Sequence, residues 1–109
     1  MPNQPKTPSR SVRVDDPEWE AAEPATRRYD SDRTKVVKQF FDWYFHKPGV
    51  ELERPPLTDL AEIIGEEARE VEKAVLSEPR PKEREKLERR SRALADMLAK
   101  IEERQRGGV

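Results

Sequence analysis

The chain has 109 residues, of which 33% are apolar and 41% are charged, and its formal net charge is −1. So small an apolar share leaves one chain short of surface to bury, and oligomerisation is the usual remedy at this size. The sequence contains no cysteine and a single histidine, His46, which excludes disulfide frameworks, thiolate chemistry and multi-histidine metal sites. We therefore expect at least a dimer, with no metal and no other cofactor.

No apolar run approaches the roughly 18 residues of a membrane span. The first ten residues, MPNQPKTPSR, also lack the hydrophobic stretch of a signal peptide. We therefore expect a cytoplasmic protein that has no membrane partner.

Charge is distributed unevenly at the start of the chain. Before Asp15 every charged side chain is basic, and these are Lys6, Arg10 and Arg13. The acidic residues that follow are Asp15, Asp16, Glu18, Glu20 and Glu23. This asymmetry confines any contact with a polyanion to the N-terminus.

The first predicted elements are an arm and a short strand. Residues 1–8 are polar, contain three prolines and show no periodicity, so they predict a disordered basic arm. From Ser9 to Asp15 the residues alternate, with Val12 and Val14 on one face and polar side chains on the other. The alternation predicts a strand. Because no second strand is evident, its simplest partner is the same strand of another copy.

Two helices are predicted next. Asp15, Asp16 and Pro17 form a typical helix start, while Pro24 predicts a helix that is short or kinked because proline removes a backbone donor. A second helix, capped by Ser31 or Asp32, runs through RTKVVKQFFDWYF and stops at KPG, residues 47–49. It is the most apolar stretch of the chain, so we expect it to form the core.

The second half predicts two further helices after a linker at residues 49–56. The first, with Thr58 as its expected cap, carries Leu60, Ile63, Ile64, Ala68, Val71 and Val75 at helical spacing. SEPRP, residues 77–81, breaks it. The second spans about 82–104 and carries Leu87, Leu94, Met97, Leu98 and Ile101. Residues 57–106 thus read as a helical hairpin or coiled-coil-like appendage for oligomerisation or for binding a protein partner.

One strand followed by two helices resembles the ribbon-helix-helix family of DNA-binding regulators. The resemblance rests on RSVRVDDPEWEAA, at 10–22, and DRTKVVKQFFDWY, at 32–44, and covers about residues 9–45. It implies a mainly α dimer in which two chains pair their strands over four helices, with 9–48 as the DNA-binding domain. The dimer core would contain Val12, Val14, Trp19, Val36, Val37, Phe40, Phe41 and Tyr44.

The resemblance also implies DNA contacts. The paired strands would present Ser9, Ser11 and Arg13 to base edges in the major groove. Phosphate would be held at the start of the second helix near Arg33, Thr34 and Lys35, and by Lys6 and Arg10. Because the turn before this helix lacks the family's usual glycine, Asp30 would adopt the left-handed conformation.

We therefore expect a protein that binds specific double-stranded DNA, as a repressor or a phage- or plasmid-type regulator. The C-terminal helices would join dimers into tetramers or larger assemblies. Two alternatives stay open: an antitoxin whose C-terminal helices bind a toxin, and a helical scaffold protein that does not bind DNA. No pair of carboxylates lies in a context that raises a pKa, so we expect no enzymatic activity.

Overall fold

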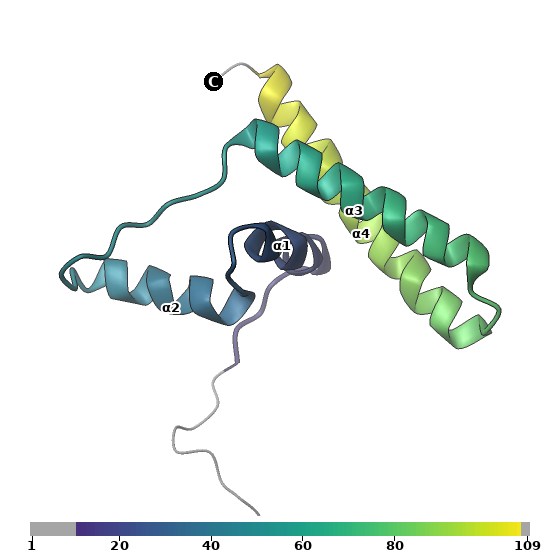
Figure 1. Ribbon diagram of the computed structural model, residues 1–109, viewed down its shortest axis with the longest axis horizontal. Coiled ribbons are helices and arrows are strands. Elements are labelled where there is room, and N and C mark those ends of the chain that lie inside the picture. Colours follow the sequence, from purple (N-terminus) through teal and green to yellow (C-terminus); the bar gives the residue numbers. More distant parts are fainter. Residues whose placement is uncertain (1–10, 108–109) are drawn as a thin grey trace, which may run out of the picture.

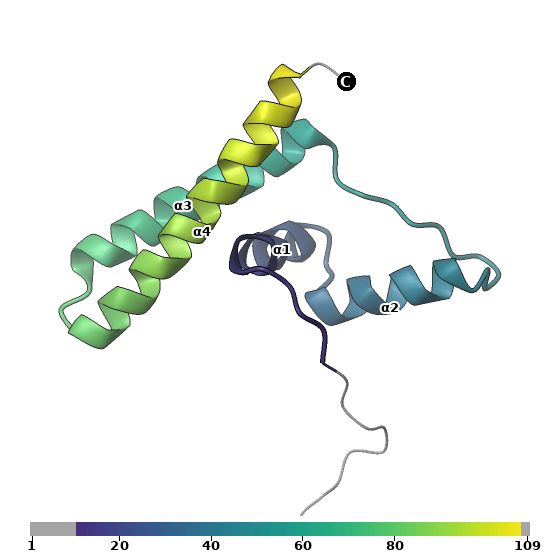
Figure 2. The same cartoon turned by 180° about the vertical axis from the view of Figure 1, so that it is seen from behind.

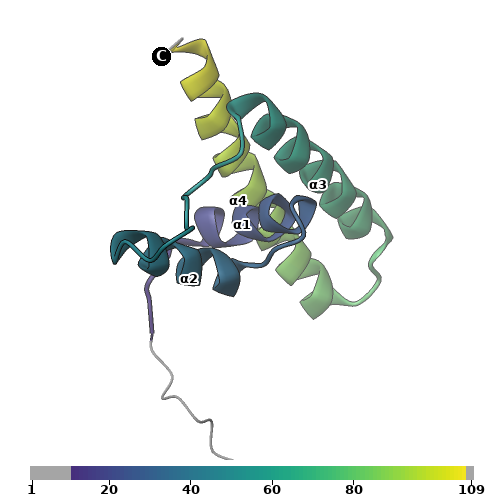
Figure 3. The ribbon, with the colours of Figure 1, turned by 60° about the vertical axis from the view of Figure 1, so that its left-hand side comes forward.

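The computed structural model describes residues 11–107, and this range contains four helices. They are α1 (Asp16–Arg28), α2 (Arg33–Tyr44), α3 (Leu57–Ser77) and α4 (Pro81–Arg106). The helices α3 and α4 lie side by side as a hairpin, and α1 packs across it (Figures 1 and 2). Helix α2 lies on the far side of α1 from the hairpin (Figure 3). The predicted mainly α class and the C-terminal hairpin are confirmed.

Residues 11–15 precede α1 without forming a strand, and the described range contains no strand at all. The predicted strand is therefore wrong, and so is the ribbon-helix-helix resemblance that depends on it. Alternation gives Val12 and Val14 a common face, but a strand also needs a neighbour for its backbone N–H and C=O groups. Residues 11–107 supply none, and both valines are exposed. Ser9 lies outside the described residues.

The ends of α1 and α2 follow local sequence signals. Asp15 is the N-cap residue of α1, although its side chain makes no capping hydrogen bond, and the helix continues through Pro24. At α2 the Asp32 carboxylate accepts a hydrogen bond from the Lys35 N–H at 2.8 Å, as predicted. Asp30 has a φ of 54°, so the expected left-handed residue is confirmed.

Gly49 and Pro56 lie at the two ends of the linker between α2 and α3. Beyond α2, Gly49 has a φ of 76°, which favours glycine because other residues would be strained there. Helix α3 begins at Leu57 with Pro56 at its N-cap, so the prediction that Thr58 caps it is wrong. Proline fixes its own φ, and Pro56 has an extended backbone just before the helix, so the N-cap lies two residues earlier than predicted.

The core lies within the hairpin. Its buried members are Ile63, Ile64, Ala68 and Val71 from α3, Leu94 and Ile101 from α4, and Ala21 from α1. Ile64 and Leu94 have no exposed surface. Their spacing of three, four and seven residues places them on one face of each helix, as an amphipathic pattern predicts.

Helix α2, by contrast, has no buried residue, so the prediction that it forms the core is wrong for the single chain. The helical spacing of its apolar residues shows that α2 has an apolar face. It does not show which element of the protein packs against that face. The helices α3 and α4 are joined by a few residues and cover one another, whereas residues 45–56 separate α2 from α3. Among the helices, α2 contacts α1 alone. Its place in a dimer core stays a prediction.

Arg90 of α4 joins three helices. Its guanidinium lies 3.0 Å from Glu20 and 3.2 Å from Glu23, both on α1, and 3.0 Å from Glu67 on α3. Partial burial lowers the pKa of Arg90, but the hydrogen bond to Glu67 and the charge of Glu23 outweigh it and raise the pKa above its usual value. The buried residues of α1 are only Ala21, Pro24 and Ala25. Ion pairs therefore add to the packing of small residues that attaches α1 to the hairpin.

Replacing Arg90 tests this attachment. Arg90→Met leaves three carboxylates facing one another, so we expect the free energy of unfolding to fall by about 1–3 kcal/mol in urea denaturation. Arg89→Met removes the same charge from an exposed neighbour and should change it by less than about 0.5 kcal/mol. Equal losses in the two variants would show that Arg90 does not hold α1.

Truncating the centre of the hairpin tests the position of the core. Leu94→Ala removes a fully buried side chain, so we expect a loss of about 2–5 kcal/mol in the free energy of unfolding. Leu76→Ala makes the same chemical change at a side chain that is 89% exposed, and it should be nearly neutral. Thermal unfolding followed by circular dichroism compares the two variants with the wild type.

Candidate functional site

Aromatic side chains are absent from the core. All seven aromatic residues of the sequence are exposed, by 43% or more. Most lie on or beside α2, where they form with two valines a patch that we call the aromatic face. Its members are Val36, Val37, Phe40, Phe41, Trp43, Tyr44 and Phe45. A contiguous apolar patch of this kind usually marks an interaction site.

The rings of the aromatic face pack on one another. The Phe40 ring centre lies 5.8 Å from that of Phe41, 5.9 Å from that of Trp43 and 6.2 Å from that of Tyr44. Tyr44 and Phe45 meet edge to face at 5.4 Å. These separations are typical of favourable aromatic pairs. The rings therefore form a preformed, continuous apolar surface along one helix.

Arg33 connects the aromatic face to α1. Its guanidinium carbon lies 4.0 Å from the centre of the Trp19 ring, and its Nη1 donates a hydrogen bond to the Trp19 carbonyl oxygen at 3.1 Å. The same nitrogen lies 4.0 Å from Glu23. A guanidinium over an indole ring is a favourable cation–π contact. The sequence prediction placed Trp19 and Arg33 in different roles, and the structure brings them together.

The opposite side of α2 is polar. The Lys38 Nζ contacts Asp42 at 2.6 Å, and Lys47 contacts the same carboxylate at 3.0 Å. Hydrogen bonds from Lys38 and Lys47 lower the pKa of Asp42, and the hydrogen bond to Asp42 raises the pKa of Lys47. The helix thus has one apolar and one polar side, and Asp42 on the polar side pairs with both Lys38 and Lys47.

The residues predicted to contact DNA lie in two groups. Ser11 and Arg13 are exposed in the segment before α1, while Ser9, Lys6 and Arg10 lie outside the described residues. At the start of α2, Arg33 is engaged with Trp19, and the Lys35 N–H donates to Asp32. A phosphate there would have to displace these partners. The DNA-contact assignments, Thr34 included, stay predictions.

The sequence prediction missed three residues that now matter. Trp43 and Phe45 extend the aromatic face, and the helical spacing of Trp43 from Val36 and Phe40 was the signal that could have included it. Arg90 was missed because its partners lie 23 to 70 residues away in sequence. Helix α4 contains many arginines, and nothing in the sequence distinguishes Arg90 as the one that pairs with carboxylates of α1 and α3.

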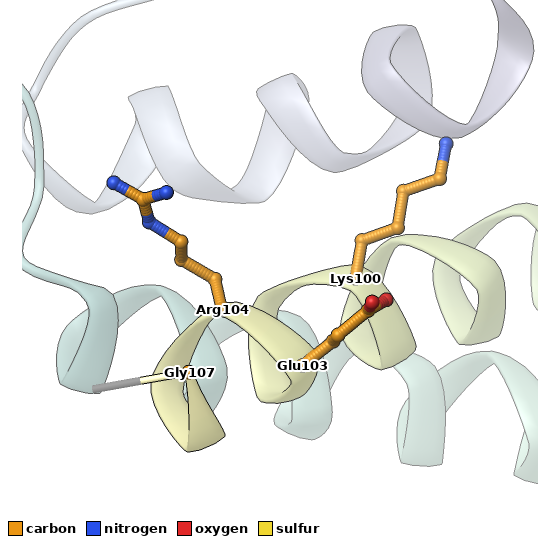
Figure 4. A pocket seen from close by; sticks show the side chains of 4 residues that line it. All are labelled: Lys100, Glu103, Arg104 and Gly107. Carbon is orange, nitrogen blue, oxygen red and sulfur yellow. The ribbon is translucent and has the colours of Figure 1, made fainter. Parts of the chain in front are cut away.

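The other surface features of the described residues are weaker candidates for a functional site. A hollow near the end of α4 is lined by Lys100, Glu103, Arg104 and Gly107, which all belong to this helix or its cap (Figure 4). Within residues 11–107 no three histidine, cysteine or carboxylate groups gather where they could hold a metal ion. No helix in that range is both long and apolar enough to cross a membrane. The aromatic face is therefore the candidate functional site.

The helicity of α2 depends on its own cap because so little else contacts it. Asp32→Ala removes the hydrogen bond to the Lys35 N–H, so we expect the helix to lose about 1 kcal/mol and its first turn to exchange amide hydrogens faster. Asp15→Ala is the matched control, since the Asp15 side chain makes no cap bond. Hydrogen exchange followed by NMR measures both. Equal acceleration in α1 and α2 would contradict the expectation.

Comparison with known proteins found no matching family model, no matching curated protein and no matching solved structure.

Proposed function

We propose that the protein binds double-stranded DNA through the basic residues that precede α1, and that it regulates transcription. The observation that carries the proposal is the separation of charge. All 23 acidic residues follow Val14, and the charged residues before Asp15 are Lys6, Arg10 and Arg13. Arg13 is exposed in the non-helical segment of residues 11–15.

An exposed arginine on a non-helical segment suits the DNA major groove. Its guanidinium can donate two parallel hydrogen bonds to one guanine, and the hydroxyl of Ser11, two residues away, can bond to several base edges. The acidic residues of α1 begin at once behind this segment and repel phosphate. Repulsion from the helical body therefore favours DNA contact at the N-terminal segment.

The second candidate function is a helical scaffold protein that does not bind DNA. The aromatic face favours it, because an apolar surface on a helix with no buried residue serves protein contacts rather than nucleic acid. The antitoxin alternative adds a toxin bound to α3 and α4, and it stays a prediction. DNA affinity separates the first candidate from the scaffold.

Fluorescence anisotropy with a labelled duplex from upstream of the protein's own gene tests DNA binding. We expect wild type to prefer this duplex over random competitor, and Arg13→Ala to lose about 1–3 kcal/mol per lost bidentate contact. Arg69→Ala, which removes an exposed arginine from α3, is the charge-matched control and should bind like wild type.

Salt provides the second readout of the same experiment. Contacts to phosphate release counterions, so the logarithm of the binding constant should fall linearly as the logarithm of salt concentration rises. Equal losses for Arg13→Ala and Arg69→Ala would move the contact away from the N-terminal segment. Absence of binding to any duplex at low salt would leave the scaffold as the function.

A further inference from the structure

We propose that the aromatic face is the interface with a second copy of this chain, in which two α2 helices pack face to face and antiparallel. The proposal depends on the exposed surface of α2 and not on DNA binding, so either can fail without the other. Three observations carry it: the distribution of apolar side chains, the area that they leave exposed and the order of their sizes along the helix.

The apolar side chains of the chain are divided between two places. The hairpin core is built from aliphatic residues, and only Ile64 and Leu94 are completely buried. Five of the seven aromatic side chains, which are the largest apolar ones, lie on or beside α2 instead. Folding of the single chain therefore leaves much of its aromatic surface in contact with water, and packing against a second copy buries that surface.

The exposed area matches one side of a small, specific interface. The five aromatic residues of the face are exposed by 44–68%. Because an aromatic side chain carries about 150–250 Å², these five leave on the order of 400–600 Å² accessible. A standard interface buries about 800 Å² per partner, so the aromatic face, its valines and Trp19 together supply most of one side.

The order of side-chain sizes favours an antiparallel pair. The small residues Val36 and Val37 lie at the start of α2, and the large ones, Trp43 and Tyr44, lie at its end. Antiparallel packing places the valines of one copy against the large rings of the other, with Phe40 near the two-fold axis. Parallel packing would put large rings against large rings and leave a gap between the valines.

Charge favours a second copy over a lipid surface. Lys38 and Lys47 share the single carboxylate of Asp42, which offsets one of their two positive charges, so the polar side of α2 offers only a small positive charge. The first turn of α1, next to Trp19, carries Asp16 and Glu18, which anionic lipid would repel.

The mass of the full-length protein in solution tests the proposal directly. Sedimentation velocity over a range of concentrations should give wild type twice the 12.7 kDa mass of one chain. Phe41→Glu introduces a charge into the aromatic face and should give the mass of one chain. Leu76→Glu introduces the same charge at an apolar side chain that is 89% exposed on α3, and it should remain dimeric.

A second readout leaves the seven residues of the aromatic face unchanged and replaces Trp19, at its margin, by another aromatic residue. In Trp19→Phe the remaining tryptophan, Trp43, is 46% exposed in the single chain. Dilution should shift its emission to longer wavelength as the dimer dissociates. A single-chain mass for wild type at every concentration overturns the proposal, as does a dimer that survives Phe41→Glu. A monomer that co-sediments with vesicles of anionic lipid would identify a lipid surface as the occupant.

Cysteine cross-linking tests the orientation, because the sequence has no cysteine of its own. Phe40→Cys, near the proposed axis, should form a disulfide-linked dimer on mild oxidation. Val36→Cys should not, because in an antiparallel pair the two copies of residue 36 lie about eight residues apart along the helices, roughly 12 Å, well beyond disulfide reach. Efficient linking at both positions would overturn the antiparallel arrangement.

Discussion

The carboxylates gathered by Arg90 decide how the parts of this chain meet. Helix α1 offers the hairpin only small buried residues, and the ion pairs of Arg90 add charge contacts to that packing. Glu23 lies within ion-pair distance of both Arg90 and Arg33, and Arg33 in turn covers Trp19. One carboxylate thus links α4, α1 and α2. This link positions the three helices but adds only modestly to the free energy of unfolding, because each partly exposed ion pair contributes little.

The sequence predicted those features that depend on near neighbours. The hairpin followed from apolar residues at helical spacing, and the cap at Asp32 and the left-handed Asp30 followed from local backbone preferences. The strand before α1 failed because pairing is not a local property. Alternation at Val12 and Val14 describes faces, while a strand exists only where another strand supplies hydrogen bonds.

The candidate site was predictable in kind but not in place. The helical spacing of Phe40, Phe41 and Tyr44 identified an apolar face, and the structure contains it. The inference that the most apolar helix forms the core was wrong for the single chain. Hydrophobicity indicates that a surface is favourably buried, but not which element or molecule buries it. Contacts over long sequence separations, such as Arg90 with Glu20, left no pattern to find.

The linker at residues 45–56 has a consequence for how this protein can change. It separates the helix that carries the apolar surface from the hairpin that carries the core. Substitutions on the exposed face of α2 therefore create no cavity at Ile64 or Leu94, and substitutions in the hairpin core leave the exposed side chains of α2 in place. Changes in the exposed apolar surface and changes in the stability of the core therefore involve separate sets of residues in this protein.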